Sequence, residues 1–194
     1  MPVTSLITPL QSGRYYHLYN RGNNKERLFH FKGNYDFFLE KYFFYLNSFV
    51  QTYSYCLLPN HFHFLVRVRE NEINPKKVSN QLRKLFICYA RNINIQEKRS
   101  GCLLSKNFRR VEINQEDYLK RLVLYIHYNP VKHGIVNDFT YYPYSTFNLI
   151  VLNQSSLIDK TELINWFGGY DNFLDFHRIK NDDIRIKKLK IEDL

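Results

Sequence analysis

Two apolar, strand-like runs, residues 52–58 and 61–69, are separated only by Pro59 and Asn60, and this arrangement constrains the fold more than any other feature of the chain. Proline and asparagine both favour tight turns, so the two runs predict a β-hairpin. A hairpin pairs its strands in opposite directions, and we therefore expect an antiparallel sheet.

The second strand of this hairpin carries two histidines separated by one apolar residue. Side chains on a strand alternate between its faces, so His61 and His63 point to one side. Phe62 and Phe64 take the other side and anchor the strand in a core. Two imidazoles on one face can bind a divalent metal ion or a phosphate, although an ordinary half-exposed pair is the alternative.

The strands and helices predicted on either side of the hairpin follow a known order of elements. Further strands are predicted at 15–20 and 108–113, and helices at 34–49, 75–92, 115–129, 160–166 and 170–179. Strand, helix, two strands, helix, strand is the order of an α+β ferredoxin-like sandwich, with helices on one face of an antiparallel sheet. The short C-terminal helices follow it.

The helix predicted from residue 115 carries Tyr125 and Asn129 one turn apart. Apolar residues recur at helical spacing between Leu119 and Ile126, which predicts one buried stripe. Pro130 disfavours helical geometry in the residue before it, so we expect the helix to end at Asn129. Spacing alone also fits a core tyrosine and a C-terminal helix cap at Asn129.

Charge is concentrated in one part of the chain. The 194 residues carry a net charge of +10, with an isoelectric point near 9.4, which favours an anionic partner. Residues 81–110 contain eight Lys or Arg against the single acid Glu97. We interpret this block as a phosphate-binding surface, with a solvated helix face as the alternative. A second basic run, at 185–190, fits either a contact with the same partner or a frayed end.

Composition excludes several classes of protein. With 44% hydrophobic and 17% aromatic residues, the chain is not disordered. No apolar run is long enough to span a membrane, and residues 1–13 lack the pattern of a signal peptide. The three cysteines have no metal-ligand spacing, and their odd number is typical of reduced thiols in the cytoplasm.

Five sequence motifs, in order, resemble one enzyme family. They are Tyr-His-Leu-Tyr-Asn-Arg-Gly at 16–22, Leu-Pro-Asn-His-Phe-His at 58–63, Phe-Arg-Arg at 108–110, Tyr-Ile-His-Tyr-Asn-Pro-Val-Lys-His-Gly at 125–134 and Pro-Tyr-Ser-Thr-Phe at 143–147. Together they resemble the single-tyrosine transposases of the His-hydrophobic-His nuclease superfamily. Within it, the chain is most similar to REP-associated tyrosine transposases, relatives of the insertion-sequence-200-like enzymes. The resemblance implies a catalytic domain at 14–150 and a helical extension at 151–194.

The resemblance implies a metal-dependent single-stranded DNA endonuclease and strand-transferase. Tyr125 matches the nucleophile, which would form a 5′-phosphotyrosine, and His61 with His63 match the metal-binding pair. Asn129 matches the position of a third ligand, and the expected metal is Mg²⁺ or Mn²⁺. The residue types suit the chemistry, because a cation neutralises the phosphodiester and a phenolate is a good leaving group.

The implied partner is single-stranded DNA with a stem-loop, bound by a monomer or homodimer in the bacterial cytoplasm, associated with the nucleoid. Its candidate contacts are Arg21, Lys25, Arg83, Lys84, Arg91, Lys106, Arg109 and Arg110. We expect the block at 81–110 to bind the stem and the loop at 21–25 to read the flank. A non-catalytic nucleic-acid-binding module is the alternative function, and a replication initiator or relaxase is a third.

Three other histidines have weaker assignments. His17 lies on the first predicted strand, where it either has a structural role or tunes the site. His127 faces away from Tyr125 on their helix. His133 follows the predicted helix end and is expected in a loop.

Overall fold

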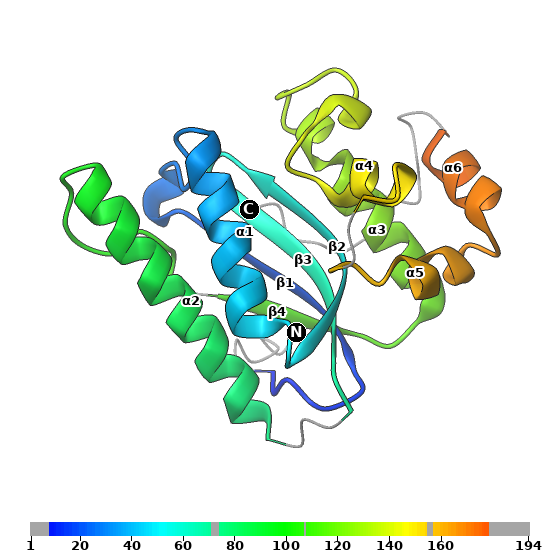
Figure 1. Ribbon diagram of the computed structural model, residues 1–194, viewed down its shortest axis with the longest axis horizontal. Helices are drawn as coiled ribbons and strands as arrows, with labels where there is room; N and C mark the ends of the chain where they lie inside the picture. Colours follow the sequence, from blue (N-terminus) through cyan, green and yellow to red (C-terminus); the bar gives the residue numbers. More distant parts are fainter. Residues whose placement is uncertain (1–7, 71–73, 107, 155–156, 179–194) are drawn as a thin grey trace, which may run out of the picture.

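A four-stranded antiparallel sheet forms the centre of the protein. The computed structural model describes residues 8–70, 74–106, 108–154 and 157–178. The strands are β1 (Tyr15–Arg21), β2 (Val50–Leu58), β3 (His61–Val68) and β4 (Arg109–Ile113), in the spatial order β2-β3-β1-β4 (Figure 1). This order and the antiparallel pairing confirm the predicted α+β ferredoxin-like class.

Two helices, α1 (Lys32–Leu46) and α2 (Pro75–Gln96), cover one face of the sheet, and a short 3₁₀ helix, η1 (Asn23–Lys25), precedes them. Phe62 packs against Phe38 of α1 with 5.1 Å between ring centroids, and Phe64 stacks on Tyr42 at 4.1 Å. The predicted bounds of both helices were wrong: α1 begins before residue 34 and ends before residue 49, while α2 continues past Asn92 to Gln96.

The opposite face of the sheet is covered by α3 (Glu116–Lys132) and the short C-terminal elements, so the sheet lies between two layers, whereas helices were predicted on one face (Figure 1). These elements are η2 (Phe139–Tyr141), α4 (Thr146–Val151), α5 (Lys160–Trp166) and α6 (Tyr170–Arg178). None of the helices within the described part of the chain has the length and apolar character needed to cross a bilayer. The predicted basic run at 185–190 lies outside the described residues.

The prediction that α3 ends at Asn129 was wrong, because the helix continues through Pro130 to Lys132. Proline removes one backbone donor, but the last turn is closed by other bonds. The amide of Ile135 donates to the carbonyl of Pro130 at 2.8 Å, and that of Gly134 donates to Val131 at 2.9 Å. These are the two bonds of a Schellman motif, with Gly134 at a φ of 65°. Asn129 is therefore inside the helix and does not cap it.

A bulge in β2 positions the second layer. The pairing with β3 shifts between Thr52 and Ser54, which leaves Tyr53 as an extra residue. Tyr53 and Ser54 consequently both face the α3 side. The Tyr53 hydroxyl donates to a Glu162 carboxylate oxygen of α5 at 2.6 Å, and Ser54 Oγ lies 3.0 Å from His127 Nε2 of α3.

A buried histidine pair links α6 to α3. His177 Nδ1 lies 2.8 Å from the carbonyl of Phe173 and must donate to it, so His177 Nε2 is the acceptor for His127 Nδ1–H at 2.9 Å. His127 Nε2 then accepts from the hydroxyl of Ser54 or of Thr146, which are 3.0 and 2.9 Å away. This confirms that His127 faces away from Tyr125. Residues beyond 150 thus pack on α3 through His177 and on the sheet through Glu162. The domain boundary at residue 150 itself stays a prediction.

The histidine pair predicts acid-sensitive folding. Burial lowers the pKa of His177 to about 4, against about 6.5 in an unfolded chain. Protonation therefore favours unfolding, so the contribution of His177 to the free energy of unfolding is constant above about pH 7 and falls as the pH drops from about 6.5 to 4. Urea titrations at pH 7.5, 6 and 5 should show this fall, and His177→Gln should reduce it. The His30→Gln variant is the control, because His30 is partly exposed. Equal pH dependence in wild type and His177→Gln would contradict the assignment.

Candidate metal and nucleophile site

The two histidines of β3 lie beside Tyr125 of α3, on the face of the sheet opposite α1. The ring centroids of His61 and His63 are 5.2 Å apart with perpendicular planes, and His63 lies 5.5 Å from Tyr125. All three are buried, with 4%, 0% and 4% of their surfaces exposed. The shared face predicted from the strand pattern is confirmed, and Tyr125 faces the pair.

Three buried polar atoms at this place have no hydrogen-bond partner among the described residues: His61 Nε2, His63 Nε2 and Asn129 Oδ1. Buried polar atoms are nearly always paired, so three neighbouring exceptions need a cause. The other polar atom of each group is occupied. His61 Nδ1 lies 2.7 Å from Asn60 Oδ1, His63 Nδ1 lies 2.9 Å from His17 Nε2, and Asn129 Nδ2 donates to the Tyr125 carbonyl at 3.1 Å.

Both histidines are held in the neutral form. Burial, with a smaller contribution from the neighbouring His133, lowers the pKa of His61 to about 3, although the nearby Asn129 side chain opposes the shift. Burial also lowers the pKa of His63 well below its usual value, with His17 adding to the shift. His61 donates its Nδ1–H to Asn60 Oδ1, so its Nε2 presents a lone pair, which is the form that binds metal ions. His63 presents one in the tautomer whose Nδ1–H donates to His17 Nε2.

The donor set that results is two imidazole nitrogens and one amide oxygen. Within the described residues, no three His, Cys, Asp or Glu side chains are grouped so as to hold a metal. Asn129 would therefore supply the third donor in the place of a carboxylate or a third imidazole. An amide oxygen suits a hard cation such as Mg²⁺, and imidazole suits Mn²⁺ less well than Zn²⁺. Two imidazole nitrogens and one amide oxygen therefore fit a divalent cation, but they do not determine which metal it is.

Three site residues were missed or left open by the sequence analysis. His17 contacts His63 directly and stacks on Tyr19, with 4.5 Å between centroids. Lys132 Nζ lies 5.1 Å from the centre of the Tyr125 ring, and His133 lies 4.7 Å from His61 between ring centroids. Positions 132 and 133 follow 125 and 129 at helical spacing, so extending the helical period past Pro130 would have found both.

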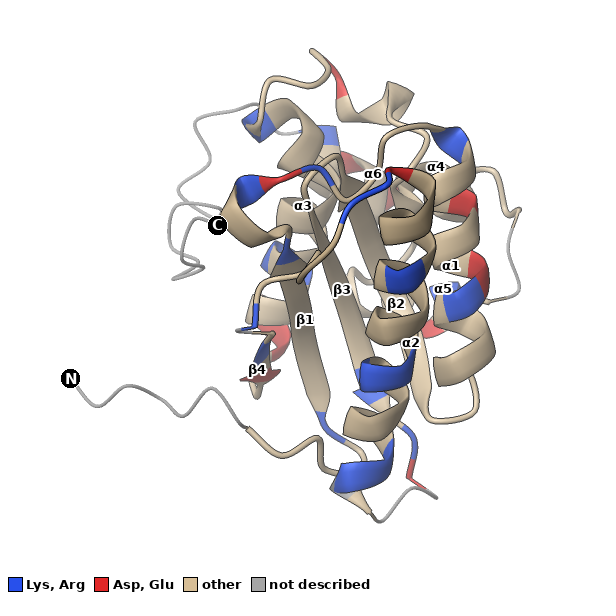
Figure 2. Cartoon of the chain, turned by 90° about the vertical axis from the view of Figure 1, so that its left-hand side faces the viewer, with Lys and Arg blue, Asp and Glu red and all other residues tan. Residues whose placement is uncertain are grey.

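The predicted DNA contacts lie on two different surfaces. Arg21 on β1 lies directly opposite His61 on β3, and the backbone carbonyl of Lys25 lies near the Asn60 side chain. Arg21 and Lys25 are therefore next to the site. Arg109 is opposite Tyr19 on the site's face of the sheet, whereas Arg110 bonds to Ser79 of α2 on the other face. Arg83, Lys84 and Arg91 belong to α2, and Lys106 is exposed in the segment before β4. Figure 2 shows basic residues along α2.

Comparisons with known proteins point to the same family. No protein-family model matches the chain. A protein of Haemophilus influenzae described as "Putative REP-associated tyrosine transposase" is 33% identical over 104 residues, which are 50% of this chain and 59% of that protein. This similarity confirms the resemblance that the motifs predicted, over half of the chain. The matched region spans about three fifths of this relative's length.

A solved structure shares the fold. It is that of a REP-associated tyrosine transposase bound to a REP hairpin, with a TM-score of 0.62 and 21% sequence identity. The similarity covers 78% of this chain and 86% of the other. It supports the α+β arrangement of an antiparallel sheet between helices.

The contact between His17 and His63 predicts a stability effect. His17→Phe keeps a ring against Tyr19 but leaves His63 Nδ1 buried without a partner, which costs about 1–3 kcal/mol. Urea denaturation at pH 7.5 should show this loss. His30→Phe should change stability by less than about 0.5 kcal/mol, because it is a surface substitution. The prediction fails if the two variants are equally stable.

Proposed function

We propose that the protein is a metal-dependent single-stranded DNA endonuclease and strand-transferase that uses Tyr125 as its nucleophile. The observation that carries the proposal is the group of three unpartnered, buried donors next to this tyrosine. A purely structural tyrosine would not need two neutral histidines and an amide oxygen left unpaired beside it. The similarity to REP-associated tyrosine transposases supports the same reaction class.

His61, His63 and Asn129 would hold the divalent cation, Mg²⁺ or Mn²⁺, through Nε2, Nε2 and Oδ1. A bound cation would neutralise charge on the phosphodiester and polarise it toward attack. The role of His17 and Asn60 is orientation. Each holds the Nδ1 side of one histidine, which leaves Nε2 of both rings buried without a hydrogen-bond partner among the described residues.

Tyr125 would supply the oxygen that attacks phosphorus. Its phenol loses a proton, a bond forms between Oη and phosphorus, and the bond from phosphorus to O3′ breaks. The departing O3′ takes up a proton and leaves a free 3′-hydroxyl, with the 5′-phosphate linked to the tyrosine. A later 3′-hydroxyl can reverse these steps and join two strands. The ammonium of Lys132 lies 5.1 Å from the centre of the Tyr125 ring, so a positive charge stands beside the attacking group.

We propose that the substrate is an unpaired strand next to a stem-loop. An in-line attack needs a phosphate free of duplex stacking, and the structural relative is one bound to a REP hairpin. Arg21, Lys25 and Arg109 lie on the face that carries the site and would contact the flank.

Tyr125 comes from the same chain as its histidines, so one copy suffices for a complete site. Only 4% of Tyr125 is exposed, so we expect DNA binding to open this region.

A covalent adduct tests the nucleophile. With Mn²⁺ and a stem-loop labelled on the 3′ side of the cut, wild type should form a species that survives denaturing electrophoresis. Tyr125→Phe should form none, because the attacking oxygen is absent. Tyr128→Phe is the control, since it removes a less buried hydroxyl from the same helix. Binding of DNA by wild type without an adduct would instead support a non-catalytic binding module.

Metal binding can be measured without activity. Mn²⁺ at 100 times its dissociation constant should stabilise wild type by about 2.7 kcal/mol, seen as a rise in Tm. In EDTA, Asn129→Ala should lower the free energy of unfolding by less than a typical buried substitution does, because it removes the unpaired Oδ1. With Mn²⁺ its Tm should rise less than that of wild type. An equal rise in both proteins would remove Asn129 from the ligand set.

A further inference from the structure

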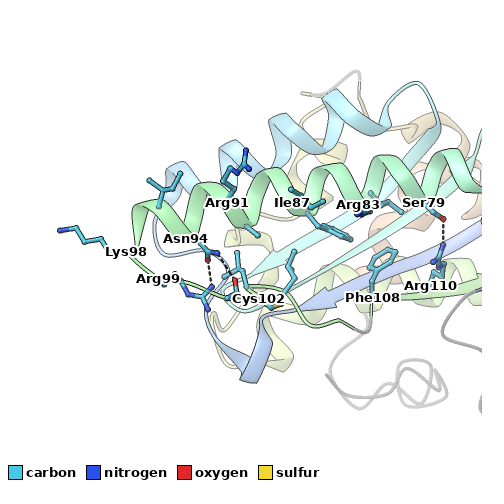
Figure 3. A pocket seen from close by; sticks show the side chains of 17 residues that line it. Ser79, Arg83, Ile87, Arg91, Asn94, Lys98, Arg99, Cys102, Phe108 and Arg110 are labelled. Carbon is cyan, nitrogen blue, oxygen red and sulfur yellow. Dashed lines mark hydrogen bonds between the residues drawn. The ribbon is translucent and has the colours of Figure 1, made fainter.

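A groove lies on the α2 side of the sheet, away from Tyr125. It runs between α2 and the segment that leads into β4, with a volume of about 870 Å³ (Figure 3). Phe86 of α2 and Phe108 form part of its wall, with 5.1 Å between ring centroids. Phe86 also packs on Phe62, which places the groove on the face opposite the histidines.

The groove combines exposed apolar side chains with positive charge. Ile87 and Ile95 are 54% and 74% exposed, which is unusual for isoleucine. Its lining contains no Asp or Glu, and the basic side chains in it are Arg83, Arg91, Lys98, Arg99 and Arg110. Among the ion pairs of the described residues, Arg99 is the groove cation with an acidic partner, Glu26 at 2.5 Å. Such a surface suits a ligand that is both flat and anionic.

Arg110 is held at one end of the groove. Its Nη1 donates to Ser79 Oγ at 2.7 Å, and its guanidinium carbon lies 5.8 Å from the centre of the Phe108 ring (Figure 3). Its Nε is buried and has no hydrogen-bond partner among the described residues. The side chain is therefore fixed beside an aromatic ring, with donor capacity left over.

We propose that this groove binds an unpaired base of the DNA strand, stacked against Phe108 and Phe86, with the flanking phosphates on the arginines. The inference rests on the proposed function for the identity of the strand. A duplex hides the faces of its bases and would leave the apolar wall uncovered, whereas an unpaired base exposes a face that stacks on aromatic rings. An apolar peptide would cover the apolar wall of the groove, but it would not neutralise the arginines and the lysine that line it.

Strand β4 connects the groove to the site. It is the edge of the sheet, and its consecutive residues Arg109 and Arg110 point to opposite faces. A DNA strand that crosses this edge meets Arg109 on the Tyr125 side and Arg110 at the groove. The two surfaces can therefore bind successive parts of one strand.

The test uses fluorescence anisotropy with the full chain and two DNA probes. One is a stem-loop with a single-stranded flank, and the other is the same stem-loop without it. Wild type should bind the flanked probe on the order of tenfold more tightly. Phe108→Leu keeps an apolar side chain but removes the ring, so it should lose most of this difference and bind the flankless probe as before. Phe44→Leu is the control, because Phe44 is 75% exposed on α1, outside the groove.

Three other outcomes would overturn the inference. If Phe108→Leu weakens both probes equally, the groove binds the stem. If it weakens neither while the Tyr125 adduct still forms, the groove has no part in DNA binding and the proposed function stands. If wild type binds neither probe and forms no adduct, the proposed function fails as well. Photocrosslinking of 5-iododeoxyuridine in the flank gives a second readout, since it should label Phe108 or Phe86.

Discussion

The alternation of side chains along β3 is the constraint on which the rest of the structure depends. Phe62 and Phe64 enter the aromatic core under α1, and this fixes His61 and His63 on the other face. A slip of one residue in the pairing would exchange the two sets. The hydrophobic packing that forms the sheet thus also sets the spacing of the candidate ligands, on a central strand and not on a loop.

That arrangement has an energetic cost. Each buried donor or acceptor without a partner costs on the order of 1–3 kcal/mol, and the site holds three of them together. The large aromatic core, built around residues such as Phe38, Tyr42 and Tyr89, offsets this cost. A fold selected for stability alone would fill the same position with apolar side chains. Retaining polar ones is the pattern expected where function opposes stability.

The features predicted well from sequence are those set by neighbours in the chain. The hairpin, the shared face of His61 and His63 and the order of elements follow from short-range periodicity. The end of α3 was wrong because Pro130 was given more weight than Gly134, whose positive φ closes the helix. The contact of His17 with His63 and that of His127 with His177 depend on which strands and helices become neighbours. No local pattern contains that information. The opposite facing of Arg109 and Arg110, in contrast, follows from strand alternation and was available in the sequence.

The bulge in β2 has a consequence for how this architecture can vary among relatives. The extra residue at Tyr53 shifts the phase of the strand, so Thr52 and Tyr55 both serve the α1 core while Tyr53 and Ser54 anchor α5 and α3. Deleting Tyr53 would restore regular alternation with Ser54 still facing α3, so the strand would lose its anchor to α5 and keep the one to α3. The bulge and helix α5 should therefore be inherited together, and a relative that lacks one should lack the other.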